Sequence, residues 1–425
     1  MFDKFKQLFK PQNKDLRKRI LFTFFVLFLF KLGTTIIVPG IDTDTLGTSN
    51  LGFLELLNVM GGGAMERFSI FALGVTPYIN ASILMQLLQA DIIPYFADLA
   101  KQGQTGRAKL NQISRYVGIA LAFIQGYFFS FAFIAKGTPI QYLTYALILT
   151  AGTALLLWLG DQITQKGIGN GISLIIMAGI IATLPNMFLE VWDAFFTTAS
   201  TQVMMLGITK FILFVLFYIA IVLGVVFVES SERRIPIQYA NKSTSAYGAQ
   251  QNYIPFKLNS AGVIPVIFAS AIITIPGLLT QIIKNDGFKL FVSNYLSFNS
   301  MVGFGIYIVC IFVFAYFYTF FQLKPKELSE NLSKNGGYIP GVRPGDETVS
   351  YISKVLKRIT TAGAFSLAVI AGLPIVFSAF SSLSTNVRIG GTGLLIVVGV
   401  ALETYKQLDS ELVTREYTRG RRRRS

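Results

Sequence analysis

The chain of 425 residues is 52% hydrophobic and only 14% charged, with a mean hydropathy of +0.56, values that exclude an ordinary soluble enzyme or binding domain. It has no histidine, which removes the commonest metal ligand and general base. The single cysteine, Cys310, lies in an aromatic-rich apolar block, where we interpret it as a small buried hydrophobe. We therefore expect no cofactor, no metal site and no disulfide framework.

Apolar blocks of about 20 residues follow one another along the chain, and a helix of that length crosses the ~30 Å hydrocarbon layer of a bilayer. The first block follows a basic stretch, as in a signal peptide, but it is too long and has no small-residue cleavage site, so we expect it to be retained. The predicted spans are residues 20–38, 68–90, 113–134, 139–159, 171–189, 208–228, 260–282, 302–322, 360–379 and 391–407.

Basic residues are strongly biased to one side of these spans. The side that holds both termini carries 30 of the 37 Lys and Arg residues and 15 of the 22 acidic residues, so the whole net charge of +15 lies there. By the positive-inside rule this side is the cytoplasm. The protein is therefore predicted to be multi-pass, with both termini in the cytoplasm.

The ten spans divide into two halves, residues 20–190 and 191–407, flanked by a basic N-terminus (1–19) and a basic tail (408–425). Because each half has an odd number of spans, the halves have opposite orientations, as in inverted-repeat transporters whose pathway lies between the halves. The predicted fold is all-α, with ten transmembrane helices in two inverted five-helix halves around a central pore.

A short apolar segment, residues 51–67, precedes the second span on the external side. Its apolar part is half a bilayer long, and three consecutive glycines then break the helix and allow a hinge. A short helix at membrane depth requires surrounding protein or a water-filled cavity. We predict a re-entrant plug at about 53–65, while the pattern equally allows an amphipathic helix on the outer surface. The plug residues are Phe53, Leu54, Leu57, Asn58, Met60, Gly61, Gly62 and Gly63.

Asp, Glu, Lys and Arg are absent from residues 68–90, 258–283 and 359–387. Ion-coupled transporters usually keep a charged residue at mid-membrane, so a secondary transporter of a small solute is the less favoured alternative. No catalytic constellation and no phosphate-binding loop is present, which argues against a membrane enzyme and against a built-in nucleotide motor.

Two basic cytoplasmic loops, 229–259 and 323–359, are long enough to protrude. Composition alone favours contact with anionic lipids, and docking of a cytosolic partner, including ribosomal RNA, is the alternative. Turn-forming Pro and Gly residues bracket Arg343, so its guanidinium is held at a loop tip and suits a carboxylate or phosphate. Satisfying the topology rule is the alternative for this arginine. The candidate docking residues are Arg233, Arg234, Lys334 and Arg343.

Several motifs occur in a fixed order from one end of the chain to the other. They are KLGTTIIVPGID at 31–42, SIFALGVTPYINASILMQLL at 69–88, LGDQITQKGIGNGISL at 159–174, VESSERRIPIQYA at 228–240, LNSAGVIPVIFASAI at 258–272, YIPGVRPGDET at 338–348 and GGTGLLIVVGVALE at 390–403. With the segment at 51–67, this series resembles the SecY family of protein-conducting channels.

The resemblance implies an hourglass channel that is plugged from outside and opens sideways into lipid. It places an aliphatic constriction, which prevents ion leakage by dewetting, on Val75, Ile79, Ile176, Ile267 and Ile396. Without the resemblance each would be interpreted as ordinary helix packing. It also implies a lateral gate between the second and third spans and the seventh and eighth. The candidate gate amides, for which a static packed interface is the alternative, are Asn80, Gln86, Gln125 and Asn259.

The implied function is the central subunit of the Sec protein translocase in the bacterial cytoplasmic membrane. Such a channel passes unfolded, signal-bearing polypeptides and releases transmembrane helices into the bilayer. The implied partners are small membrane subunits of the SecE and SecG type, the SecA ATPase, the ribosome, signal peptides and nascent chains, and anionic lipids. No enzymatic activity is expected.

Overall fold

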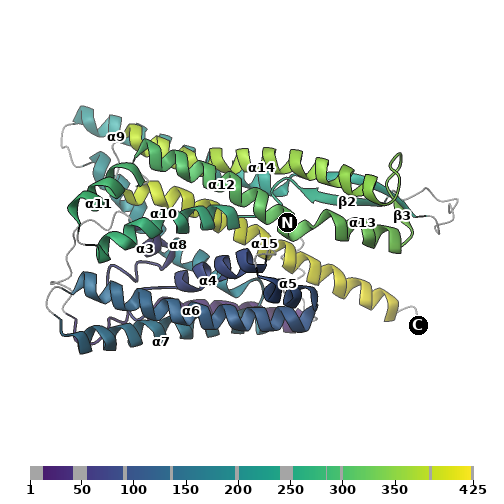
Figure 1. Cartoon of the computed structure of the whole chain (residues 1–425). Helices are drawn as coiled ribbons and strands as arrows, with labels where there is room; N and C mark the ends of the chain where they lie inside the picture. Colours follow the sequence, from purple (N-terminus) through teal and green to yellow (C-terminus); the bar gives the residue numbers. More distant parts are fainter. Residues whose placement is uncertain are drawn as a thin grey trace.

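The computed structural model is dominated by long helices that run side by side (Figure 1). It describes residues 13–41, 55–89, 93–134, 137–196, 201–239, 252–283, 285–296, 300–381 and 385–422. The helices that correspond to the predicted spans are α2 (Lys14–Gly33), α4 (Thr76–Leu87), α6 (Gln104–Phe133), α7 (Pro139–Lys166), α8 (Gly171–Phe196), α9 (Thr201–Ser230), α10 (Ile264–Ile282), α12 (Met301–Leu323), α14 (Asp346–Ser381) and α15 (Thr385–Arg422).

The membrane-spanning helical fold is confirmed. Each predicted span falls on one of these helices, and α7, α8, α9, α12 and α14 contain stretches long and apolar enough to cross a membrane. Local sequence signals begin some of them. Thr138 and Gln141 form a capping box at the start of α7, with Pro139 at the first helical position, and the Ser300 hydroxyl accepts a hydrogen bond from the Gly303 amide at the start of α12.

The second span differs from the prediction of a continuous helix over 68–90. Residues 68–75 form a series of turns, and α4 begins only at Thr76, just before Pro77. Phe68 and Gly74 both have positive φ, which a continuous right-handed helix does not allow. The turns are tolerated because protein satisfies their backbone: the Ile70 amide donates to the Ile36 carbonyl at 3.0 Å.

The two loops that were predicted to be cytoplasmic, 229–259 and 323–359, contribute strands to a small sheet that the prediction of an all-α fold did not include. Strands β1 (Glu232–Tyr239) and β2 (Asn252–Lys257) come from the first loop, and β3 (Gly337–Tyr338) comes from the second. They are antiparallel in the order β2-β1-β3. Beside the sheet lies α13 (Pro325–Lys334), and together they form the end of the molecule opposite the short helix α11 (Asp286–Phe291) (Figure 1).

The arrangement of the halves is visible in the colouring of Figure 1. Helices α4, α6 and α7 lie on one side, α9, α12 and α14 lie on the other, and α15 runs between them. The largest apolar cluster joins both halves, because it combines buried residues of α4 and α8 with buried residues of α10, α12 and α15. The centre of the molecule, where a pore is predicted, is therefore closed by apolar side chains.

Candidate functional site

The predicted constriction residues come together from four helices. Val75 at the start of α4, Ile79 on α4, Ile176 on α8 and Ile396 on α15 are each 6% exposed or less, and Ile267 on α10 packs against the same apolar cluster. They share this cluster with both halves of the protein. Closely packed apolar side chains disfavour the entry of water and ions.

Ile180 belongs to the same cluster and was not among the predicted residues. It is fully buried, lies one helical turn after Ile176 on α8, and is the side chain that a Cβ on Gly393 of α15 would meet, at 2.8 Å. The spacing of four residues between two isoleucines on one helix was the available signal. It was missed because α8 has apolar residues on all of its faces.

The predicted plug begins outside the described residues, since Phe53 and Leu54 are not among them, and Leu57 is described only as helical backbone. The described part is the short helix α3 (Glu55–Met60), followed by Gly61, Gly62 and Gly63. Asn58 and Met60 are each 6% exposed, and Met60 belongs to the cluster that holds the constriction residues. Helix α3 contacts α8 and α15, so it lies within the helix bundle and not on the outer surface.

The backbone around α3 is positioned by glycines and by Asn58. Gly62 and Gly63 have positive φ, which glycine adopts without strain. The Asn58 side chain accepts a hydrogen bond from the Glu66 amide at 3.2 Å and donates one to the Glu66 carboxylate at 3.3 Å. On α8, a Cβ added to Gly179 would lie 2.2 Å from the Met60 carbonyl oxygen, so only glycine permits this contact.

A groove of about 520 Å³ lies between α4, α6 and α10, where the lateral gate is predicted. Its walls are mostly apolar, including Ile83 and Leu84 of α4 and Ile272 and Ile275 of α10. Contacts between α10 and either of the other two helices are sparse compared with those between α4 and α6. An apolar opening between weakly attached helices can accept an apolar segment from the bilayer or from the pore.

Two of the four predicted gate amides line the groove, and the other two do not. Asn80 and Gln125 line the groove from neighbouring helices, as predicted for a gate. Gln86 lies further along α4, and its side-chain oxygen is buried without a hydrogen-bond partner among the described residues. Asn259 lies elsewhere: its amide donates to Glu229 at the end of α9 and to the Gly262 carbonyl, both in its own half.

Arg343 lies at a loop tip whose backbone is held in place. Its amide donates to the Glu347 carboxylate at 3.4 Å, and its carbonyl accepts from the Thr348 hydroxyl at 2.8 Å. Its exposed guanidinium is in none of the ion pairs found among the described residues. The loop is therefore ordered by backbone contacts that leave the charged group accessible.

The other predicted docking residues lie on strand β1 and helix α13. Arg233 and Lys334 are exposed. Arg234 pairs with Glu232 at 2.7 Å and lies 4.7 Å from the ring centre of Tyr253. The hydrogen bond that Arg234 donates to the Glu232 carboxylate raises the pKa of Arg234 above its usual value, so this group stays charged. Unlike Arg343, Arg234 must leave a partner to bind another anion.

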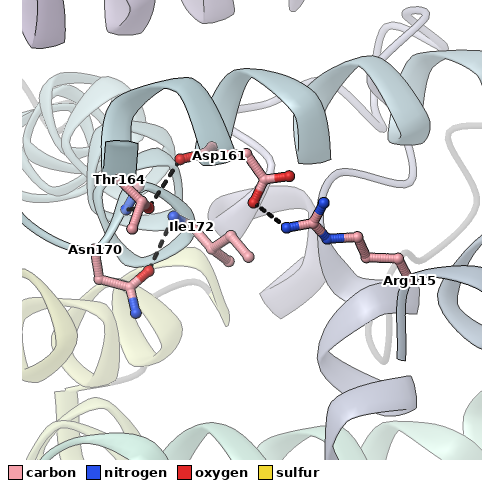
Figure 2. A network of polar contacts seen from close by, with 7 residues as sticks. Arg115, Asp161, Thr164, Asn170 and Ile172 are labelled. Atoms are coloured by element: carbon pink, nitrogen blue, oxygen red, sulfur yellow. Dashed lines mark hydrogen bonds and ion pairs between the residues drawn. The ribbon is translucent and has the colours of Figure 1, made fainter. Parts of the chain in front are cut away.

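A polar network that links α6, α7 and the start of α8 is shown in Figure 2. Arg115 of α6 pairs with Asp161 of α7 at 2.7 Å. The Thr164 hydroxyl accepts from the Gly171 amide at 2.9 Å, and Asn170 accepts from the Ile172 amide at 3.1 Å, which joins α7 to the start of α8. These contacts connect α6, α7 and α8 and explain Asp161, Thr164 and Asn170 of the motif at 159–174.

Comparison with known proteins identifies a family. Residues 69–405 match the family model described as SecY. The protein translocase subunit SecY of Staphylococcus carnosus is 46% identical to this chain over 98% of it and 99% of the relative. The corresponding subunit of Staphylococcus aureus strain NCTC 8325 is 47% identical over 96% of each chain.

Solved structures share the fold at low sequence identity. A structure described as a protein-conducting channel has a TM-score of 0.63 at 19% identity and covers 94% of this chain and 93% of its own. Sec61 in a canine ribosome–channel complex from the endoplasmic reticulum has a TM-score of 0.61 at 18% identity with the same coverage. A SecY structure whose plug domain is described as stabilising the closed state and maintaining a membrane seal has a TM-score of 0.59 at 19% identity, again with the same coverage.

Proposed function

The chain belongs to the SecY family of protein translocase subunits, and on that premise we propose which of its residues close the channel, which open it and which meet its partners. It is a multi-pass membrane protein and the channel-forming subunit of a Sec translocase, which moves polypeptides across a membrane and passes apolar helices into it. A secondary transporter of a small solute gains no support from its relatives.

The observation that carries the proposed mechanism is the aliphatic cluster that joins both halves at the centre of the bundle. The five predicted constriction residues, with Ile180, form the ring that closes around a moving chain. A translocating polypeptide carries charged residues, each of which would cost about 2.5–3.5 kcal/mol at the centre of a lipid-exposed helix. A path between the halves, 20–190 and 191–407, avoids that cost, and the ring keeps the path dry when idle.

Helix α3 and the glycines after it form the plug. Its burial against α8 and α15 supports this role, as does the plug described for the related SecY structure. To open the channel, α3 must leave its contact with Gly179. The lateral gate is the groove between α4, α6 and α10, and Asn80 and Gln125 supply polar contacts that are weak enough to break, typically about 0.6 kcal/mol in a membrane.

The chain catalyses no reaction in this proposal, and the driving force comes from partners at the cytoplasmic side. Arg343, Arg233, Arg234 and Lys334 form the docking surface for the SecA ATPase and the ribosome, supported by the accessible guanidinium of Arg343 and by the ribosome-bound Sec61 relative. SecE-type and SecG-type subunits contact the outer helices. Anionic lipids of the bacterial cytoplasmic membrane meet the basic side of the protein.

Reconstitution of the protein with SecE-type and SecG-type subunits into vesicles tests this function. With SecA and ATP, a radiolabelled precursor with a signal sequence should become protected from added protease, and the same precursor without its signal should not. Protection that is independent of the signal, or saturable uptake of small solutes without any precursor transport, would contradict the proposal.

A further inference from the structure

Glu229 is an acidic residue at an unfavourable position, and its surroundings explain why it is retained there. It lies at the C-terminal end of α9, where the helix dipole disfavours a negative charge, and it is partly buried. The Asn259 amide donates to its carboxylate at 2.5 Å, and the Lys406 ammonium donates to its carbonyl oxygen at 3.1 Å. Three segments, α9, the turn before α10 and α15, therefore meet at this residue.

The turn that leads into α10, residues 258–263, is in close contact with the residue before β1, with α14 and with α15. The Leu258 amide donates to the Ser231 carbonyl at 2.8 Å, which continues the pairing of β1 with β2. A Cβ added to Gly363 of α14 would lie 2.3 Å from the Leu258 carbonyl oxygen, and one added to Gly399 of α15 would lie 2.5 Å from the Val263 side chain. The cytoplasmic end of α10 is thus closely attached to its own half.

The rest of α10 is attached differently. Ala271, Ile272, Ile275 and Leu279 line the groove that separates α10 from α4 and α6. Pro276 lies inside this part of the helix, where it removes one backbone hydrogen bond and makes bending easier. One helix therefore combines a fixed cytoplasmic base with an outer part that borders open space.

We propose that Glu229, Asn259 and Lys406 form a fixed pivot for α10, about which its outer part tilts to widen the lateral groove. The pivot explains why Asn259, an amide next to a gate helix, makes its hydrogen bonds within its own half. In this proposal, which rests on the proposed channel function, Glu229 and Asn259 are positioning residues. They hold the base of α10 so that movement occurs at the groove.

A pair of cysteines tests whether the base stays fixed during transport. In a Cys310→Ser background, Glu229→Cys with Asn259→Cys removes the side-chain hydrogen bond between these two residues. While reduced, this variant should translocate precursor more slowly, by on the order of tenfold, as for the loss of a hydrogen bond to a charged group. Joining the thiols with a short bifunctional reagent should restore the rate, because the link replaces the lost attachment.

The matched control joins opposite walls of the groove, with Leu84→Cys on α4 and Ile275→Cys on α10 in the same background. Linking this pair should stop translocation, since the groove then cannot widen. If linking the base pair stops translocation as well, the base of α10 moves and the pivot is wrong. Equal rates for the parent and the reduced base variant would also overturn it.

A spin label at Ser260→Cys, in the same Cys310→Ser background, measures the mobility of the base of α10 in the absence of transport. The label should be immobile in the parent and in Glu229→Gln, whose amide oxygen still accepts from Asn259, and mobile in Glu229→Leu. Equal mobility in Glu229→Gln and Glu229→Leu would contradict the pivot. If the parent itself moves no precursor, the proposed function fails, while the label still tests the pivot.

Discussion

A single glycine determines how closely α3, the proposed plug, can approach α8. Gly179 faces the carbonyl oxygen of Met60, and no other residue fits there without moving α3. Gly224 on α9 offers a contrast, because a Cβ added to it would meet nothing within 4 Å. The same substitution at the two positions therefore separates a local steric effect from a general effect of alanine in a membrane helix.

We expect Gly179→Ala to raise the resting ion conductance several-fold over that of the parent, because the added methyl group pushes α3 away from α8, an overpacking that costs about 1–3 kcal/mol. Gly224→Ala should leave the conductance unchanged. Single-channel recordings in planar bilayers measure both. Identical recordings for the two variants would mean that α3 does not depend on contact with Gly179.

Ile79 should contribute to the dry layer at the constriction. Ile79→Ser places a hydroxyl among the apolar side chains of this cluster, so water should enter and the resting conductance should rise. Ile219→Ser, the same change at a half-exposed position on α9, serves as the control. The idea fails if both variants conduct ions at the level of the parent in planar bilayers.

Arg343 should act through the shape of its guanidinium. Because a lysine keeps the charge but lacks the planar fork of donors, Arg343→Lys should lose most of the motor-driven translocation that Arg343→Ala loses, about tenfold for one or two charge-assisted hydrogen bonds. The rate of precursor entry into vesicles is compared at equal channel content. A parental rate for the lysine variant would show that charge alone is sufficient.

At the residue scale, sequence could predict which positions are apolar but not which neighbours a polar group meets. The constriction residues are recognisable from motifs that resemble a known family, and they do lie in one cluster. Asn259 was predicted beside the gate, yet it bonds to Glu229. Its true partner lies 30 residues earlier in the chain and meets it only because the β1–β2 hairpin brings the two ends together.

At the scale of helices and strands, hydropathy predicts where a transmembrane helix occurs. The positions at which a helix is interrupted depend on tertiary contacts. The length of each apolar block predicts a span, and a helix is found at each one. The turns at 68–75 were not predicted, because apolar residues look alike in a helix and in irregular chain that is enclosed by protein. Strand β3, two residues long, leaves no detectable pattern in the sequence.

Removing the plug tests its role as an element. Deletion of residues 53–60 should yield a folded channel with higher resting conductance that also accepts weaker signal sequences, because α3 contributes closure and not architecture. Membrane insertion of the variant is measured by alkaline extraction and its leakage in planar bilayers. If the deleted protein fails to insert, the segment is required for the fold.

At the scale of the whole molecule, the one-sided charge predicts orientation in the membrane. In a Cys310→Ser background, a cysteine that replaces Glu330 on α13 should react with an impermeant maleimide only from the cytoplasmic side. A cysteine that replaces Asp286 on α11 should react only from the outside. Both positions are exposed. Labelling of either one from the opposite side of sealed vesicles would reverse the orientation assigned from the basic residues.

The three-stranded sheet also has a consequence for the time course of biosynthesis. Gln238 on β1 and Tyr338 on β3 are neighbours in the sheet but 100 residues apart in the chain. At about 5–20 residues per second, β1 leaves the ribosome roughly 5–20 seconds before its partner strand exists. During that interval α10, α11, α12 and α13 are made, so the edge of β1 that later pairs with β3 stays open until these helices have been synthesised.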